Sequence, residues 1–390
     1  FFVIYRLISE ETDSMAVNGA NQRERMRERP CKGGKPMSKS FVNKVLVGGA
    51  LAAGAAVWAI APRTFSDKRR NYVPAVPDVW YAHRGLHDAG SGLTAQYASE
   101  SGEYVALARR MAMKAGYGSP SVAGAIAPEN SLAAFAAACE AGYGIELDLQ
   151  MTADGEIVVV HDGDLMRVAG DPRRVADLTY DELTRIPLFP TDAPGAAVAA
   201  PLSGSLEKPP LVTTPDSAPD GYFQHVPLFA DVLKVVAGRV PLIVEYKFDD
   251  NSKWGPRDVE LMEKGDALLQ AYSGAYVIES FNPAAVNWYK ENRPEVCRGQ
   301  LSWWPQGEEK PSDPGALAKE YAAGALIFDW ISRPDFVAYD WHGGNSPQVR
   351  LARFMGAVPV SWTVRSRDEL AQCDDWFDHH IFEAFVPDER

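Results

Sequence analysis

The residues most able to do chemistry in this chain begin with two acidic side chains, Glu146 and Asp148, in the apolar segment Gly144–Leu149. Side chains two positions apart on a strand face the same side. Two carboxylates on an inward face repel each other and resist burial unless a positive group joins them. A hard divalent cation, bound through oxygen ligands, would supply that charge. The apolar neighbours of the pair disfavour the alternative of an exposed edge strand.

A second segment, Leu242–Lys247, repeats this spacing with opposite charges, because Glu245 and Lys247 are also two positions apart. On an inward strand face, Glu245 could complete the oxygen shell of the cation. Lys247 would then point toward an anion such as a phosphate. The alternative is an internal ion pair between these two side chains.

Histidines end two further apolar runs, Val79–His83 and Ile157–His161. Barrel enzymes place catalytic groups at the carboxyl ends of parallel strands, and two imidazoles form a natural acid and base pair near neutral pH. Either histidine alone could be structural, but two of them flanking a carboxylate pair indicate catalysis. Arg84, which follows the first histidine, can join Lys247 in contacting a phosphoryl group.

The order of these motifs along the chain resembles that of the glycerophosphodiester phosphodiesterase family, over about residues 78–388. The motifs are His83-Arg84-Gly85, Pro128-Glu129-Asn130-Ser131, Glu146-Leu147-Asp148, His161-Asp162, Glu245-Tyr246-Lys247, Glu279-Ser280-Phe281 and Trp362-Thr363-Val364. The resemblance implies a TIM-type (β/α)8 barrel and one divalent cation, Ca2+ or Mg2+. It also implies hydrolysis of a glycerol phosphodiester to glycerol phosphate and an alcohol.

The resemblance also implies a role for each matched residue. The catalytic histidines are His83 and His161, the metal ligands are Glu146, Asp148 and Glu245, the phosphate contacts are Arg84 and Lys247, Glu129 supports the site, and Trp362 lines the glycerol pocket. His87 lies outside the motifs and is expected to be dispensable. The chain departs from the family pattern at Arg365, where Asn is usual, and around Glu383, where a Thr-Asp pair is usual. These departures concern the substrate more than the chemistry.

Several functions remain open at this point. A lysophospholipid or a glycerol-phosphate polymer of the teichoic-acid type could replace a soluble diester as substrate. A membrane-anchored binding barrel without activity is a third possibility, but no histidine or metal carboxylate of the pattern is missing. The residues do not reveal which histidine is the acid, which alcohol leaves, or the oligomeric state.

The elements that must position these residues alternate from about residue 78 onward. Strands are expected at Val79–His83, Gly144–Leu149, Ile157–His161, Leu242–Lys247, Tyr276–Phe281, Arg298–Ser302, Phe336–Tyr339, Pro359–Val364 and Ile381–Ala384. Helices between them, such as Arg257–Gln270, indicate parallel βαβ units and a barrel domain over residues 78–390. Nine strands are one more than a barrel needs, so one is accessory. Residues 86–127 and 180–226 break the rhythm and are expected to overhang the catalytic face as a lid or rim. A disordered surface insertion is the alternative for residues 190–216.

The N-terminal part differs in charge and hydropathy. The whole chain carries a net charge of -13, while residues 1–70 hold 13 Lys/Arg and 6 Asp/Glu, or +7, which leaves -20 for the remainder. An acidic body argues against nucleic-acid binding. Residues 1–40 are expected to be a disordered tail, 41–62 a transmembrane or signal-anchor segment, and 63–77 a linker. A cleaved signal or a buried helix are the alternatives for residues 41–62.

Two further expectations follow. A retained anchor would make this a single-pass protein of the cell membrane, with its catalytic domain outside the cytoplasm. The four cysteines are not closely spaced, so the sequence contains no zinc or redox motif.

Overall fold

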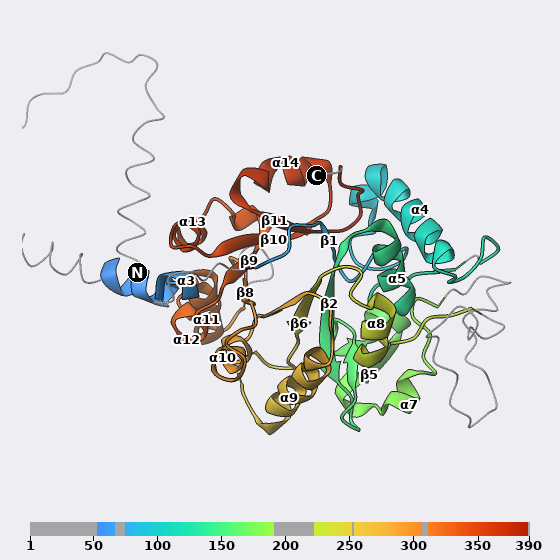
Figure 1. Cartoon of the computed structure of the whole chain (residues 1–390), viewed down its shortest axis with the longest axis horizontal. Coiled ribbons are helices and arrows are strands. Elements are labelled where there is room, and N and C mark those ends of the chain that lie inside the picture. Colours follow the sequence, from blue (N-terminus) through green and yellow to red (C-terminus); the bar gives the residue numbers. More distant parts are fainter. Residues whose placement is uncertain are drawn as a thin grey trace, which may run out of the picture. The chain divides into compact units, whose positions relative to one another are not determined.

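Eight parallel strands close into a barrel in the computed structural model, which describes residues 53–66, 75–122, 124–190, 222–251, 253–305 and 311–388 (Figure 1). The strands are β1 (Tyr81–Ala82), β2 (Gly144–Met151), β6 (Leu242–Tyr246), β7 (Tyr276–Ser280), β8 (Arg298–Ser302), β9 (Phe336–Asp340), β10 (Val358–Val364) and β11 (His379–Phe382). The barrel closes because β1 pairs with both β2 and β11. The predicted TIM-type barrel is therefore confirmed.

The ninth predicted strand is the accessory one. β3 (Ile157–Val159) lies antiparallel to β2, with Leu149 opposite Val159. Only a short turn through Gly155, whose φ is +81°, joins the two strands. A parallel crossover needs a dozen or more residues, so this connection can form only a hairpin.

Helices cover the outside of the barrel. They are α5 (Leu132–Ala141), α8 (Phe229–Val236), α9 (Pro256–Gln270), α10 (Pro283–Asn292), α11 (Pro314–Gly324), α12 (Asp329–Ser332), α13 (Pro347–Phe354) and α14 (Arg367–Cys373). Proline in the first turn begins α9, α10, α11 and α13, where its missing N–H costs nothing. Helix α11 ends at Gly324 and the short α12 begins at Asp329, and between them Leu326 adopts a left-handed φ of 57°, which a continuous α-helix does not allow.

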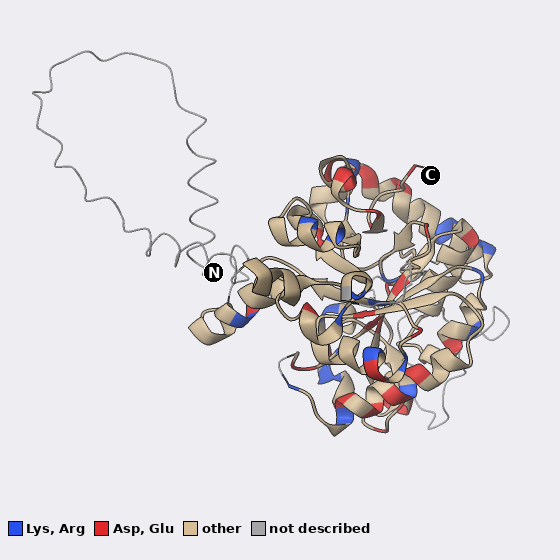
Figure 2. Cartoon of the chain, turned by 60° about the vertical axis from the view of Figure 1, so that its left-hand side comes forward, with Lys and Arg blue, Asp and Glu red and all other residues tan. Residues whose placement is uncertain are grey.

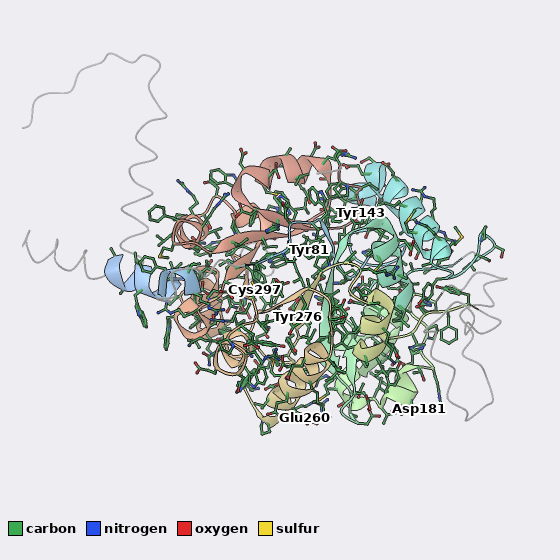
Figure 3. The ribbon with its side chains drawn as sticks, viewed as in Figure 1. Tyr81, Tyr143, Asp181, Glu260, Tyr276 and Cys297 are labelled. Carbon is green, nitrogen blue, oxygen red and sulfur yellow. The ribbon has the colours of Figure 1, made fainter. Side chains whose placement is uncertain are left out.

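Two apolar layers hold the barrel together. Inside the barrel, a cluster near the beginning of the strands includes Tyr81, Ile243, Cys297 and Phe336. Figure 3 labels Tyr81 and Cys297 among these side chains. A larger cluster fills the space between the strands and the outer helices. At the carboxyl ends of β2 and β6, the side chains that face inward are charged, and these are the residues predicted to do the chemistry.

The two segments that broke the predicted rhythm have separate roles. Residues 86–127 contain α4 (Ala98–Lys114), which buries Tyr104, Ala108 and Ala112 and packs on α5. This segment therefore belongs in part to the outer shell. Of residues 180–226, positions 191–221 lie outside the described residues.

A small lobe follows β3 and was not predicted. It consists of β4 (Asp164–Leu165), α6 (Met166–Ala169), β5 (Asp171–Arg174) and α7 (Tyr180–Leu183). The lobe has its own apolar cluster, which includes Leu165, Val175 and Leu183. Its strands are too short and too polar to show an alternating pattern, so the hairpin could not be predicted from the sequence.

The described end of the apolar N-terminal run packs on the barrel. Residues 53–60 are helical, Ala59, Ile60 and Ala61 are buried, and a short helix α3 (Arg63–Ser66) follows where a linker was expected. The backbone N–H of Arg63 donates to the carbonyl of Pro334, 3.0 Å away. None of the described helices is both long and apolar enough to cross a membrane. The expected tail, residues 1–40, and the first part of the 41–62 segment lie outside the described residues.

In Figure 2, acidic and basic residues are interspersed along the ribbons of the outer helices.

Candidate active site

Three buried carboxylates meet at the predicted metal site. Glu146 and Asp148 come from β2 and Glu245 from β6, and one oxygen from each lies within 4.8 Å of the others. The strand register brings them together, since Asp148 pairs directly with Glu245. All three predicted metal ligands are thus in one place.

The charges of this cluster are not balanced. Burial and the neighbouring Asp148 raise the pKa of Glu146 well above its usual range. Burial raises the pKa of Glu245 to about 7, although Lys247 opposes the shift. Burial would also raise the pKa of Asp148, but Lys247, His161 and Arg84 hold that pKa below its usual range. The cluster therefore carries more carboxylate than its own cations can neutralise.

The donor set fits a hard divalent cation. Carboxylate oxygens are the ligands that Ca2+ and Mg2+ prefer, and three such oxygens within 4.8 Å can reach one ion. The buried Oε1 of Glu245 accepts no hydrogen bond from the described residues. A bound cation would satisfy this oxygen and remove the repulsion that raises the pKa of Glu146 and of Glu245.

Arg84 and Lys247, the predicted phosphate contacts, border the carboxylates. The Nζ of Lys247 lies 2.8 Å from Oε2 of Glu245 and 3.3 Å from Oδ1 of Asp148. The backbone N–H of Arg84 donates to Oε2 of Glu146 at 3.1 Å, and its Nη1 donates to Oε1 of Glu129 at 2.8 Å. Both cations are mostly buried, so their charge is poorly screened by water.

The backbone at Arg84 is held in a rarely used conformation. Arg84 and Asn130 both have a φ of 56°, a left-handed value that costs energy for residues other than glycine. The N–H of Asn130 donates to the carbonyl of Arg84 at 2.9 Å, and the Asn130 side chain donates to Asp148 at 2.8 Å. The Pro128–Ser131 motif therefore does more than begin α5, because it fixes both Arg84 and a predicted metal ligand.

His83 lies directly beyond β1, beside the carboxylates. Its Nε2 is 3.9 Å from Oε2 of Glu146, and its Nδ1 is 2.7 Å from Oε2 of Glu383. Burial lowers the pKa of His83 to about 4, against the opposing effect of Glu383. His83 is therefore neutral near pH 7 and able to accept a proton.

His161 follows β3 and is more exposed than His83, at 33% against 12% of the side chain. Its Nδ1 lies 2.6 Å from Oδ1 of Asp162. Burial and then Lys247 lower its pKa. His161 lies close enough to Asp148 to help lower the pKa of that carboxylate, so it borders the same acidic cluster as His83.

Glu129 takes up the supporting position predicted for it and reveals a residue that the sequence analysis missed. Arg167, on α6 of the small lobe, donates to both carboxylate oxygens of Glu129, at 2.6 Å and 2.9 Å. The same guanidinium donates to Asp162 at 2.7 Å. Arg167 thereby ties the small lobe to the site. In the sequence, only its position five residues after Asp162 could have suggested that Arg167 lies near the site.

Trp362 lies on β10 and packs on the inner cluster of the barrel. It meets Phe281, which follows β7, edge to face at 5.5 Å. The Nζ of Lys247 lies 5.8 Å from the Phe281 ring. These aromatic side chains form an apolar wall beside Lys247.

Two more carboxylates near the site were not assigned a role from sequence. Glu279 on β7 stands opposite Glu245 in the register, and burial raises its pKa well above the usual range. Glu383 follows β11 and is fully buried. Both lie in strands that were predicted from the sequence, but their roles depend on contacts between distant strands.

Comparison with known proteins agrees with this geometry. The glycerophosphoryl diester phosphodiesterase family matches residues 122–382. That range includes Glu129 and the residues from β2 onward, whereas His83 and Arg84 precede it.

The chain is 45% identical over 60 residues to a glycerophosphodiester phosphodiesterase of Caldanaerobacter subterraneus subsp. tengcongensis, which covers 15% of this chain and 25% of that protein. It is 28% identical over 173 residues to a putative glycerophosphodiester phosphodiesterase of Bacillus subtilis, covering 44% and 58%. The chain thus spans about a quarter of the length of the first curated relatives it matches.

One crystal structure, of a putative glycerophosphoryl diester phosphodiesterase from Silicibacter pomeroyi, has the same fold. Its TM-score is 0.50 and its identity 20%, over 80% of this chain and 92% of that one. At this identity the likeness concerns the fold.

Proposed function

We propose, since this chain belongs to the glycerophosphoryl diester phosphodiesterase family, that it hydrolyses a glycerol phosphodiester to glycerol phosphate and an alcohol. The observation that carries the proposal is the convergence of two histidines, three carboxylates and two cations at one end of the barrel. These are the groups that general acid and base catalysis on a phosphodiester needs.

One hard divalent cation, Ca2+ or Mg2+, would be held by Glu146, Asp148 and Glu245. When bound, it would supply positive charge to the phosphate oxygens and help to orient the diester. The oxygen donors and their imbalance of charge support this part of the proposal.

Arg84 and Lys247 then stabilise the charge that grows on the phosphoryl oxygens. One of the two histidines takes a proton from the nucleophile, and the other gives a proton to the leaving alkoxide. The nucleophile is either the neighbouring glycerol hydroxyl, which would give a cyclic phosphate, or water. Trp362 and Phe281 would hold the glycerol group.

Product analysis tests this function. The protein is incubated with soluble glycerophosphodiesters, lysophospholipids and a glycerol-phosphate polymer, and the products are identified by mass spectrometry. We expect glycerol phosphate and the free alcohol from the soluble diesters, and no product from His161→Ala. If only lysophospholipid or polymer is cleaved, the substrate assignment is wrong; if none is cleaved under any metal condition, the proposed activity is wrong.

We also propose that residues 41–62 attach the protein to the cell membrane, with the barrel outside the cytoplasm. The apolar run from Val45 to Pro62 supports this. So do Trp58, Phe65, Trp330 and Phe354, four large apolar side chains that are 44–89% exposed. They lie around the place where α3 meets the barrel, since Trp58 stacks on Trp330 and Thr64 bonds to Met355. Aromatic side chains favour membrane interfaces.

Liposome flotation tests the attachment. The full chain should float with vesicles, and a chain lacking residues 1–52 should do so weakly or not at all. If the full chain does not float, or if both proteins float equally, the proposal is contradicted.

A further inference from the structure

Each catalytic histidine is joined to an arginine through a carboxylate. His83 Nδ1 lies 2.7 Å from Oε2 of Glu383, and the other oxygen of Glu383 accepts from Nε of Arg365 at 2.6 Å. The acid is fully buried, and its pKa is held well below the usual range: burial would raise it, but His83 and Arg365 lower it. Glu383 is therefore ionised and can accept a hydrogen bond from the histidine ring.

The second histidine repeats the arrangement with different elements. His161 Nδ1 lies 2.6 Å from Oδ1 of Asp162, and the other oxygen of Asp162 accepts from Nε of Arg167 at 2.7 Å. Here the carboxylate is 26% exposed and the arginine 39% exposed. The two chains of contacts thus have the same chemistry, but the carboxylate of the first is fully buried, whereas that of the second is partly open to water.

A carboxylate at Nδ1 fixes the state of a neutral imidazole. The ring keeps its proton on Nδ1, because only that tautomer donates to the carboxylate, and Nε2 is left bare. The arginine holds the carboxylate in one orientation through its second oxygen. For His83, the bare Nε2 is the atom that faces the carboxylate cluster, 3.9 Å from Glu146.

We infer that Glu383 and Asp162 are positioning residues for His83 and His161, and that Arg365 and Arg167 hold those carboxylates in place. The inference rests on the proposed function for its kinetic consequences, but not for the tautomers it assigns. Glu383 and Arg365 are also the positions where the chain departs from the family pattern. The two unusual residues contact each other directly.

The long segment 86–127 contributes to the buried arrangement. Ser91 Oγ donates to Oε2 of Glu383 at 2.9 Å, and Nε2 of His87 lies 3.6 Å from the same oxygen. A side chain at Gly92 would collide with Glu383, since its Cβ would come within 2.7 Å of that carboxylate. This part of the segment therefore supports His83 from behind, and is not free to act as a lid.

Nitrogen NMR of the imidazoles tests the inference without any need for turnover. The full chain, labelled with 15N-histidine and freed of metal, is measured near pH 7.5, and the His83 and His161 signals are assigned by His83→Gln and His161→Gln. We expect Nδ1 protonated and Nε2 bare in both rings. Glu383→Gln should alter the His83 signals alone, and Asp162→Asn the His161 signals alone. Wild-type rings protonated on Nε2, or unaffected by these variants, would overturn the inference.

Kinetics provides the second arm. Glu383→Gln and Asp162→Asn should each lower kcat by about 10–100-fold, the usual loss when a partner that orients a histidine is removed, with KM within a few-fold of wild type. Arg365→Lys should restore much of the activity that Arg365→Met loses. The matched control is Arg353→Met, which breaks a surface pair with Asp378. If Arg365→Lys loses as much activity as Arg365→Met, or if the variants change KM alone, the positioning role is contradicted.

The two arms separate the failures. Correct tautomers in an inactive protein would leave the positioning intact and refute the proposed function. Activity without these tautomers would refute the positioning and keep the function. Asp162→Asn guards against misfolding as an explanation, because its side chain is partly exposed and lies in the loop between β3 and β4.

Discussion

The two ends of the barrel balance their buried charges in opposite ways. At the carboxyl end of the strands, Glu146, Glu245 and Glu279 share too few cations, and their pKa values are raised. At the other end, Arg63 forms a buried ion pair with Asp335, with Nη1 and Oδ2 3.3 Å apart.

The difference separates function from stability. An excess of buried carboxylate disfavours the folded state and persists only where a ligand is to be bound. The pair at the opposite end is matched in charge and joins the N-terminal segment to β9. We therefore expect changes at the carboxyl end to alter activity, and changes at the amino end to alter stability.

The largest effect should come from the histidines at the carboxyl end. His83→Ala and His161→Ala should each lower turnover by about 10²–10⁴-fold, because each removes a proton-transfer group. Because the proposed mechanism places both in one cycle, the double variant should be little worse than either single one. Steady-state assays measure this, and full additivity of the two losses would show that the histidines act independently.

His342 is the control for these variants, since its side chain is 53% exposed and contacts Asp340. His342→Ala should keep turnover within a few-fold of wild type. His87, expected from the sequence to be dispensable, is fully buried and lies near Glu383. We now expect His87→Ala to lower activity through that carboxylate.

At the amino end, Arg63→Met should destabilise the fold and spare the chemistry. Removing one partner of a buried pair costs about 3–5 kcal/mol, because the other charge is left buried. Chemical unfolding would show this loss, with kcat unchanged in the folded protein. Arg353→Met, at an exposed pair, should cost no more than about 1 kcal/mol. A stable Arg63→Met protein with impaired kcat would reverse the comparison.

The raised pKa of Glu245 gives the carboxyl end a pH signature. In the metal-free folded chain this pKa is about 7, compared with 4.5 for the ordinary group. Its contribution to stability is therefore complete below about pH 4.5 and is lost as the pH rises through 7, by about 3 kcal/mol in all.

Glu245→Gln, which cannot ionise, should lack this loss, so the stability of wild type relative to the variant should fall between pH 4.5 and 7. Unfolding in urea across this range measures the difference. Ca2+ or Mg2+ should abolish it in wild type. A constant difference at every pH would mean that Glu245 ionises normally.

The smallest expected effect is at the exposed aromatic stack of the amino end. Trp58 lies 5.5 Å from Trp330 and is 56% exposed. Trp58→Ala should cost about 1 kcal/mol, the usual worth of an aromatic pair, and leave turnover unchanged. Phe354→Ala, at an 89% exposed position, is the control and should cost less. If Trp58→Ala is neutral, the N-terminal segment does not contribute to the fold.

The barrel and the cluster of three carboxylates could be predicted from the sequence for a physical reason. Inward residues at strand ends must be polar to bind a ligand, so Glu146 with Asp148, and Glu245 with Lys247, interrupt apolar strands at a spacing of two. Each of these pairs is local. The nine strands, including the accessory β3, were likewise predicted from a local pattern, namely short apolar runs.

The missed residues depend on distant contacts. Glu383 reaches His83 across 300 positions of sequence, and Arg167 reaches Glu129 across 38. No local period reports such pairs. The packing of residues 59–63 on the barrel was likewise hidden, because an apolar run looks the same whether it enters a membrane or a protein core.

The most direct test of the central claim follows glycerol phosphate release from a glycerophosphodiester by wild type and Asp148→Asn. The assay is run with chelator in excess and then with Ca2+ or Mg2+ restored. We predict that wild type is inactive in chelator and recovers with one of the cations, while Asp148→Asn recovers little. Full wild-type turnover in excess chelator, or full recovery of Asp148→Asn, would contradict a site built on three metal-binding carboxylates.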